Sequence, residues 1–370
     1  MSLNSIWKSA FGIAALSVAV GAHAGSNGVK VTVEPEKAAL GASDDVVVKV
    51  TLTNTSTSPQ YVLKARTPFD GLSAPLFDIT RDGEKVAYTG ALIKRGKPTQ
   101  ADYYVLKPGA SHTVKVELSA LYDLSVSGDY AIQYRTASPD LFLPTNNGRA
   151  AAAAAAAAVA NDIGELQSDA ARVYIDGRLP RGAESPIMKA LKQNGGGTPA
   201  PLGLSYASCT ASQQTTIASA ISAAKTMSNG SVTYMANTTM GPRYTKWFGA
   251  VTASRQSTVK SHYSAIKDAF DNKSVVVDCG CNQNYYAYVY PTQPYRIYVC
   301  KAFWTAPMTG TDSKGGTLVH EMSHFNVVAG TDDHVYGQSG AASLAISNPT
   351  QAIDNADSHE YFAENTPALN

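Results

Sequence analysis

The segment from residue 316 to residue 325 constrains the fold most, because it places His320 and His324 four positions apart, with Glu321 beside the first. An α-helix turns once in ~3.6 residues, so both imidazoles lie on one face, within reach of a single zinc ion. Glu321 is then placed to act as the general base. Three apolar residues follow the i, i+4, i+7 spacing of a core-facing stripe: Leu318, Met322 and Phe325. The pattern predicts a packed helix with a metal site; the alternative is a surface helix with incidental histidines.

Two histidines leave a catalytic zinc ion short of a protein ligand, so a third ligand is expected further along the chain. The metzincin pattern requires glycine and histidine at positions that hold Val327 and Gly330, and this class is therefore excluded. Residues 330–337 read Gly-Thr-Asp-Asp-His-Val-Tyr-Gly. HExxH followed by GTxDxxYG resembles the aspzincin (deuterolysin) family of zinc endopeptidases, and both halves match at every fixed position.

The resemblance implies a role for each polar residue of these two motifs. One Zn²⁺ per chain is bound by His320, His324 and Asp333, Glu321 is the general base, and Tyr336 donates a hydrogen bond to the oxyanion. Asp332 and His334 flank the third ligand, so an assignment shifted by one residue stays open. The main alternative is a gluzincin-like site in which Glu360 or Glu364 is the third ligand.

The N-terminal segment, residues 1–24, has the organisation of a secretory signal peptide. Lys8 gives the positive start, residues 10–20 are apolar, and Ala-His-Ala at 22–24 is a cleavage site. The apolar stretch is too short to span a bilayer, and no other stretch is long enough. The sequence therefore predicts a secreted, extracellular protein. A net charge of +1 gives no reason to expect a nucleic acid or an anionic membrane as partner.

All four cysteines lie in the C-terminal half of the chain. An even number in an exported chain indicates disulfides, and the sequence alone leaves three connectivities open. Cys279 and Cys281 are too close for an easy mutual bridge, and on a strand they would share one face. The spacing resembles that of peptidyl-Lys metalloendopeptidases within the family, which implies Cys209–Cys279 and Cys281–Cys300. The alternative, a structural zinc site, has the wrong spacing.

Residues 25–180 show the period-two alternation of an all-β domain. The clearest strand patterns are at 29–33, 46–54, 112–118, 128–135 and 172–177. Short strands separated by clusters of Gly, Pro, Asn and Ser predict an immunoglobulin-like sandwich. An alanine run at 150–158 precedes the last strand and is either a short helix or a low-complexity insertion, to which we assign no function.

Residues 181–205 are predicted to be a linker, because 194–201 read Asn-Gly-Gly-Gly-Thr-Pro-Ala-Pro. The remainder, residues 206–370, has the size of one domain and is covered by the family resemblance. Its patterns predict helices at 215–228 and 254–270, strands at 274–278 and 295–299, the second at an edge, and a final helical segment after residue 349. The expected fold is α+β, helix-dominated and zincin-like.

Asp357 and Glu360 stand three positions apart in the final predicted helix and share one face. Two neighbouring carboxylates repel each other unless a cation lies between them, and the ordinary explanation is a solvated face. In peptidyl-Lys endopeptidases, acidic residues in this region line the S1′ pocket, so the resemblance implies a lysine pocket here. The compact lysine ammonium suits such a pocket better than the planar arginine group. Cleavage on the N-terminal side of lysine is therefore expected; the alternative is a broad-specificity deuterolysin.

A β-sandwich placed before a protease domain predicts an inactive preproprotein, in which the sandwich is a propeptide and an intramolecular inhibitor. The expected partners are otherwise protein or peptide substrates. Lys189 and Lys192 stand just before the glycine-rich linker, and the enzyme could release itself by cutting before them. One alternative is a stably attached accessory domain. Another is an exported binding protein with a non-catalytic zinc domain, but a metal-only site does not need the base Glu321.

Overall fold

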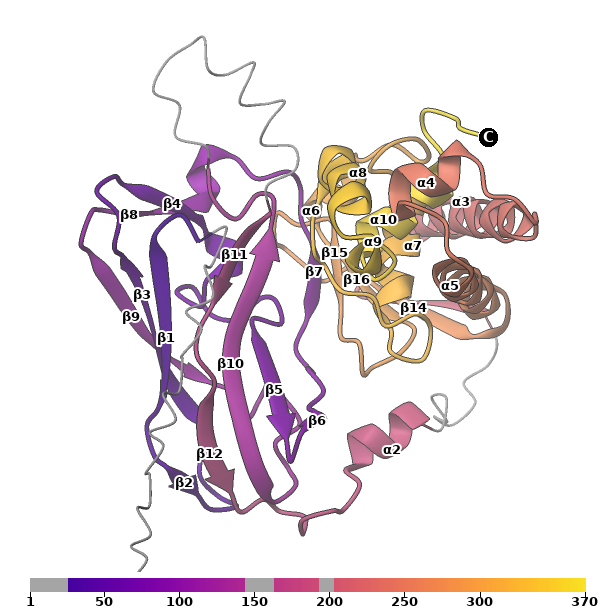
Figure 1. The fold of residues 1–370 in the computed structure, drawn as a ribbon. Helices are drawn as coiled ribbons and strands as arrows, with labels where there is room; N and C mark the ends of the chain where they lie inside the picture. Colours follow the sequence, from indigo (N-terminus) through magenta and orange to yellow (C-terminus); the bar gives the residue numbers. More distant parts are fainter. Residues whose placement is uncertain (1–25, 144–162, 193–202) are drawn as a thin grey trace, which may run out of the picture.

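The computed structural model describes residues 26–143, 163–192 and 203–370 (Figure 1). The predicted signal peptide, the alanine run and the glycine-rich part of the linker lie outside the described residues. Within the described ranges, no helix is both long and apolar enough to cross a membrane.

In the first part of the chain, here called the N-terminal β region (residues 26–180), the described regular elements are strands and two short 3-10 turns. The strands are β1 (Val29–Pro35), β2 (Ala39–Leu40), β3 (Val47–Asn54), β4 (Gln60–Leu63), β5 (Phe77–Arg81), β6 (Glu84–Lys85), β7 (Leu92–Lys94), β8 (Tyr103–Leu106), β9 (Ser111–Glu117), β10 (Gly128–Ser138), β11 (Gly164–Gln167) and β12 (Ala171–Ile175). Short 3-10 turns cover Lys64–Arg66 and Gln100–Asp102. The predicted β-rich character is confirmed, whereas the immunoglobulin-like topology stays a prediction.

Two sheets of this region share one hydrophobic core (Figure 1). One has the order β1-β3-β9, and the other has the order β2-β12-β10-β5-β6, with β11 beside β10. Alternation along β3 explains the packing, because Val48, Val50 and Leu52 are fully buried while Lys49 between them is exposed. A separate pair, β4-β8, lies outside these sheets.

The C-terminal region (residues 203–370) has a five-stranded sheet surrounded by helices (Figure 1). Its own strands are β13 (Gly203–Ala207), β14 (Ser274–Asp278), β15 (Ala287–Val289) and β16 (Arg296–Val299). Its helices are α3 (Ala211–Met235), α4 (Pro242–Phe248), α5 (Ala253–Asn272), α6 (Lys301–Thr305), α7 (Lys314–His324), α8 (Gly337–Ser347), α9 (Pro349–Ala352) and α10 (Ala356–Glu364), and α2 (Pro186–Lys192) precedes them. The helices predicted at 215–228 and 254–270 are present as α3 and α5 and extend beyond their predicted ends, whereas the final segment predicted after residue 349 is divided into α9 and α10.

The order of this sheet is β13-β14-β16-β15-β7, which corrects one expectation. The strand predicted at 295–299 is not an edge strand, because β15 pairs with β16 on its other side. Strand β13 pairs with β14 from Gly203 onward, and the division of the chain between residues 205 and 206 stays a prediction. The outermost strand, β7, belongs in sequence to the N-terminal β region. It pairs antiparallel with β15, so the two regions share this sheet.

Helix α7 begins at a capped end and is buried along its whole length. The Ser313 side chain accepts a hydrogen bond from the amide of Gly316, which satisfies one of the free donors of the first turn. A Cβ atom at Gly316 would lie 2.1 Å from Oε1 of Glu364, so the missing side chain lets α10 approach α7. The predicted apolar stripe of Leu318, Met322 and Phe325 is fully buried.

Two disulfides hold the ends of the sheet strands, with the pairing that the resemblance implies. Cys209 is bonded to Cys279 with Cα atoms 5.0 Å apart, and Cys281 to Cys300 with Cα atoms 4.8 Å apart. Cys279 and Cys281 follow the end of β14 rather than lying on a strand. The two bridges connect the start of α3 and the start of α6 to this turn.

Candidate active site

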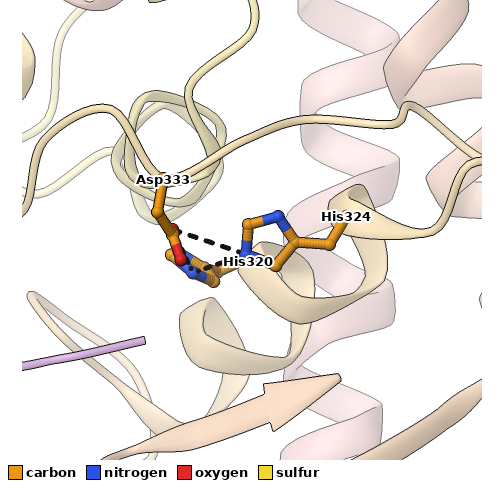
Figure 2. Close-up of side chains that lie close together, drawn as sticks. All are labelled: His320, His324 and Asp333. Carbon is orange, nitrogen blue, oxygen red and sulfur yellow. Dashed lines mark hydrogen bonds and ion pairs between the residues drawn. The ribbon is translucent and has the colours of Figure 1, made fainter. Parts of the chain in front are cut away.

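His320, His324 and Asp333 come together at the C-terminal half of α7 (Figure 2). The Nε2 atoms of the two histidines are 3.1 Å apart, and Oδ1 of Asp333 lies 3.2 Å and 3.4 Å from them. A tetrahedral zinc ion with bond lengths of about 2.0–2.1 Å keeps its ligand atoms about 3.3 Å apart. The three ligand atoms therefore already have the spacing of a zinc site.

The Nδ1 atoms of both histidines have partners, and the Nε2 atoms of both are directed at Asp333. Nδ1 of His324 lies 2.7 Å from the carbonyl oxygen of Thr331, and Nδ1 of His320 lies 2.9 Å from Oδ1 of Asp357. Such contacts fix the ring orientation and the tautomer of metal-binding histidines. Burial opposes ionisation of Asp333, but the two histidines hold the pKa of its carboxyl well below its usual range. An anionic oxygen and two imidazole nitrogens form a donor set that suits zinc.

Glu321 is buried beside this cluster, on the same helix. Both of its carboxylate oxygens lack a hydrogen-bond partner among the described residues. Burial raises the pKa of the Glu321 carboxyl to about 7. A carboxylate without protein partners and with a pKa near neutrality can take up and release a proton in a reaction.

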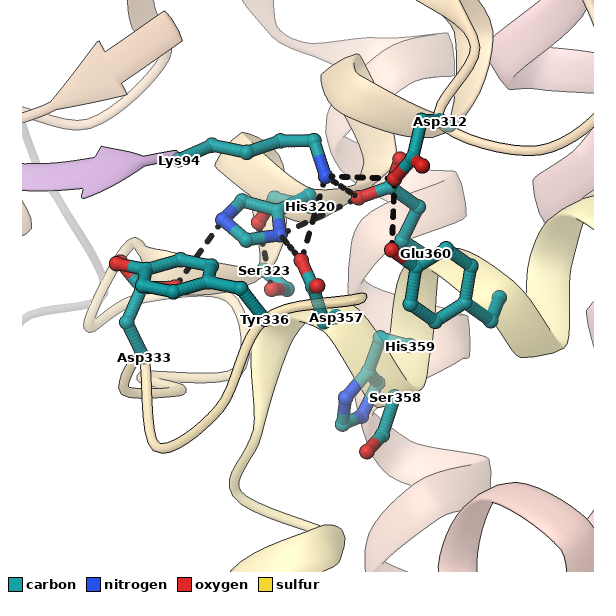
Figure 3. Close-up of polar contacts among 12 residues, drawn as sticks. Lys94, Asp312, His320, Ser323, Asp333, Tyr336, Asp357, Ser358, His359 and Glu360 are labelled. Atoms are coloured by element: carbon teal, nitrogen blue, oxygen red, sulfur yellow. Dashed lines mark hydrogen bonds and ion pairs between the residues drawn. The ribbon is translucent and has the colours of Figure 1, made fainter. Parts of the chain in front are cut away.

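Tyr336 stands at the start of α8, beside Asp333 and His320 (Figure 3). Its hydroxyl donates a hydrogen bond of 2.7 Å to the carbonyl oxygen of Ile93, in β7. Burial raises the pKa of this hydroxyl well above its usual value, so it stays protonated and remains a donor. The structure thus places the Tyr336 hydroxyl against a peptide carbonyl.

Asp357 and Glu360, on α10, form an acidic pocket next to His320, and Lys94 of β7 fills it (Figure 3). The Lys94 ammonium lies 2.6 Å from Oε2 of Glu360, 3.3 Å from Oδ1 of Asp357 and 3.7 Å from Oδ1 of Asp312. Tyr286 and Tyr361 lie beside it, with ring centroids 5.1 Å and 5.9 Å from the nitrogen. Burial alone would lower the pKa of Lys94, but the three carboxylates raise it well above its usual value.

Asp357 contacts the pocket and the metal-binding cluster at once. Oδ1 is shared between Lys94 and His320, and Oδ2 accepts a hydrogen bond of 2.6 Å from the amide of Gly337. Glu360 is also near His320, with 3.4 Å between Oε2 and Nδ1. The two acids expected to line a lysine pocket therefore also lie around Nδ1 of His320, a predicted metal ligand.

Of the residues considered as alternative ligands, Glu360 lies against Lys94 and close to Nδ1 of His320, and the other three have partners outside the cluster. Glu364 accepts hydrogen bonds from the amide and hydroxyl of Ser313, at the opposite end of α7 from His324. Asp332 and His334 form a separate group with Asp354, whose Oδ2 lies 2.9 Å from Nε2 of His334.

Sequence reasoning missed three residues of the site: Lys94, Asp312 and Arg66. Asp312 precedes the cap of α7 in a left-handed conformation, with φ of 50°, and carries no motif. The Arg66 guanidinium donates to the backbone carbonyls of Asp333 and His334. Lys94 and Arg66 lie more than two hundred positions from these partners. No local signal could have identified them.

Known proteins resemble this chain over most of its length. A solved structure titled zinc peptidase from Grifola frondosa is 48% identical, covers 44% of this chain and 100% of that chain, and has a TM-score of 0.43. The aspzincin family model, described as lysine-specific metallo-endopeptidase, matches residues 233–364. An extracellular protease of Aeromonas hydrophila is 47% identical over 333 residues, which are 89% of this chain and 91% of that protein. A peptidyl-Lys metalloendopeptidase of Armillaria mellea is 38% identical over 349 residues, again 89% and 91% of the two chains. From the family model and these two relatives, we conclude that the chain belongs to the aspzincin family of zinc metalloendopeptidases.

Proposed function

We propose that this protein is a secreted zinc endopeptidase that cuts on the N-terminal side of lysine and is made as an inactive precursor. The observation that carries the proposal is the acidic pocket beside the metal-binding cluster, in which a lysine ammonium is buried against three carboxylates. A relative with the name peptidyl-Lys metalloendopeptidase supports the same specificity.

In the proposed site, His320, His324 and Asp333 hold one zinc ion. This choice is supported by the contacts of Glu364 with Ser313 and of His334 with Asp354. Zinc would supply Lewis-acid polarisation of the scissile carbonyl and lower the pKa of a water molecule. Glu321 accepts the proton of the attacking water and passes it to the leaving amine. The Tyr336 hydroxyl donates a hydrogen bond to the oxygen on which negative charge develops.

Specificity comes from the acidic pocket formed by Asp357, Glu360 and Asp312. A buried carboxylate pair is unfavourable without a counter-charge, and a lysine ammonium with three donors supplies it. The same three acids lie 2.6–3.7 Å from one nitrogen atom. This arrangement suits the compact ammonium group of lysine rather than the planar guanidinium group of arginine. A lysine that follows the scissile bond is therefore preferred.

The proposal also includes secretion and inhibition of the precursor by its own N-terminal β region. The signal peptide at residues 1–24, the two disulfides and a relative with the name extracellular protease support secretion. The N-terminal β region, within the immunoglobulin-like propeptide expected at residues 25–180, contacts the catalytic residues through β7. That position supports a role as intramolecular inhibitor.

The test is a digest of a protein of known sequence by the mature enzyme, with every cut site mapped by mass spectrometry. We expect cuts before lysine, loss of activity with a chelator, and recovery with zinc. Glu321→Gln should reduce the rate by about 10²–10⁴-fold, as is typical for loss of a general base. Cuts without regard to lysine would identify a broad-specificity enzyme, and activity that survives chelation would contradict the zinc mechanism.

A further inference from the structure

Strand β7 leaves the N-terminal β region and forms the edge of the catalytic sheet (Figure 1). Leu92, Ile93 and Lys94 pair with β15 in antiparallel register, with Lys94 opposite Ala287. The amide of Tyr286 donates a hydrogen bond of 3.1 Å to the carbonyl oxygen of Lys94. An extended peptide that adds a strand to a sheet edge is a common mode of peptide recognition.

The chain around β7 lines two cavities between the two regions. Tyr88, before β7, and Leu92, its first residue, line one cavity together with His324. After β7, Arg95 and Gly96 line another cavity, together with Tyr336. The segment therefore passes from one side of the metal-binding cluster to the other, as a bound polypeptide substrate must.

The Ile93–Lys94 peptide bond lies between Leu92, which lines the first cavity, and Arg95, which lines the second. The carbonyl of Ile93 accepts the Tyr336 hydrogen bond, and the next side chain, Lys94, enters the acidic pocket. An enzyme that cuts before lysine requires this order: a carbonyl at the oxyanion donor, followed by lysine in the pocket. A strand in the opposite direction would not place the two groups in this order.

We infer that Leu92–Lys94 is a built-in substrate mimic, with the Ile93 carbonyl in the scissile position and Lys94 in the lysine pocket. The inference rests on the proposed function and names the residues by which the N-terminal β region blocks the enzyme. Lys94 is the residue that carries the block, because its side chain is 1% exposed and opposes three carboxylates. Without it, a lysine from outside could enter the same pocket.

A second contact joins the N-terminal β region to the loop that carries Asp333. Arg66 donates to the carbonyl of His334 at 3.1 Å and to that of Asp333. The backbone carbonyl of Arg66 in turn accepts a hydrogen bond from the buried Tyr134 hydroxyl, in β10. The loop is therefore linked to the core of the N-terminal β region independently of β7.

The test uses the full chain with Glu321→Gln, so that no peptide bond is cut. A fluorescent lysine-containing peptide is titrated in, and its Kd is measured by polarisation. Lys94→Met keeps the length of the side chain and removes its charge, and Lys107→Met, at an exposed lysine in the turn after β8, is the matched control. We expect Lys94→Met to lower the Kd by about tenfold or more, the size expected when a central buried residue is removed from an interface.

Equal Kd values for the Lys94→Met and Lys107→Met chains would overturn the inference. If Lys94→Met lowers the melting temperature strongly, Lys94→Gln replaces it under the same criterion. Cleavage before lysine by the mature wild-type enzyme is measured separately. If the Kd values are equal and the mature wild-type enzyme cuts before lysine, only the substrate mimic is rejected. If the mature wild-type enzyme does not cut before lysine, the proposed function is rejected.

Discussion

Asp357 contacts both the acidic pocket and a predicted metal ligand through a single carboxylate. One oxygen contacts both Lys94 and Nδ1 of His320, whereas the carboxylate of Asp312 contacts Lys94 and accepts a hydrogen bond from the Tyr361 hydroxyl. Replacement by asparagine is therefore expected to have different effects at Asp357 and at Asp312, although both acids lie around one ammonium group.

Asp357→Asn should weaken zinc binding by about 10–100-fold, because a carboxylate that orients a ligand histidine is lost. Asp312→Asn should retain zinc and lower kcat/KM for lysine substrates by about two- to fivefold, the range for a partly exposed ion pair. Zinc titration and peptide kinetics on the mature enzyme measure both effects. Equal zinc affinity in the two variants would show that Asp357 acts only in the pocket.

The third ligand can be tested against its neighbour in the sequence. Asp333→Asn should lose zinc and activity, because the amide has no anionic oxygen to complete the donor set. Asp332→Asn should retain both, since Asp332 belongs to the group with His334 and Asp354. Metal content after dialysis and activity on a lysine peptide are the measurements. Zinc loss in Asp332→Asn alone would shift the ligand assignment by one residue.

The sequence alone was sufficient to predict which residues group together where those residues lie close together in the chain. His320, Glu321 and His324 share one helix, and a loop of eight residues after it brings Asp333 to the same point. Lys94 and Asp312 could not be predicted, because nothing in their neighbourhood marks them and their partners are on α10. Long-range charge pairs of this kind depend on the fold and not on local spacing.

At the scale of elements, the two faces of α10 have different surroundings. One carries Asp357 and Glu360 into the pocket, and the other places His359 in the core against α5. Nδ1 of His359 lies 3.0 Å from the carbonyl oxygen of Asn355, and Nε2 lies 3.0 Å from Nδ1 of His262. Burial lowers the pKa of His359 to about 3 and lowers that of His262 as well.

This histidine pair predicts how stability depends on pH. The unfolded chain binds a proton at His359 below its ordinary pKa of 6.5, whereas the folded chain resists protonation down to about 3. The free energy of unfolding should therefore fall as the pH drops from 6.5 toward 3, by up to about 1.4 kcal/mol per pH unit from this group. Above pH 6.5 the contribution is complete.

Urea unfolding of Glu321→Gln chains at several pH values measures the slope without self-digestion. Adding His359→Gln should make the slope shallower, and adding His112→Gln, at an exposed position on β9, should leave it unchanged. The same slope in all three chains would show that His359 does not contribute to acid sensitivity.

The long elements were predictable and the short ones were not. Helices α3 and α5 have enough turns for their composition to identify them, although both extend beyond the predicted ends. Strand β15 has three residues, too few to show alternation, and without it β16 was expected at an edge. Strand β7 has three residues as well, and its partner is two hundred positions away in the chain.

At the scale of the molecule, the two regions are joined by a shared sheet as well as by the linker. Cutting the linker alone leaves β7 paired with β15 and Lys94 in the acidic pocket. A chain cut only there should therefore remain inhibited until the N-terminal β region dissociates or is itself cut. In the proposed precursor, latency therefore depends on β7 and not on the linker.

Self-digestion should therefore produce two kinds of new N-terminus. Zinc added to metal-free precursor should give chains that begin at Lys94, and others that begin at Lys189 or Lys192, the lysines before the linker. Hydrolysis at the first position adds hydroxide from water to the Ile93 carbonyl carbon and a proton to the Lys94 nitrogen. Because Lys94 is already in the pocket of its own chain, the rate of this cut should be independent of protein concentration.

N-terminal sequencing over time, at two protein concentrations tenfold apart, measures both cuts. Lys94→Met should abolish the N-terminus at residue 94 and leave the cuts at Lys189 or Lys192, which a second enzyme molecule can reach because Lys189 is exposed. Glu321→Gln should remain full length after removal of the signal peptide. A Lys94 terminus that forms faster in proportion to concentration would mean that one molecule cuts another. Its complete absence while the linker is cut would mean that β7 is held in a form that the catalytic residues do not hydrolyse.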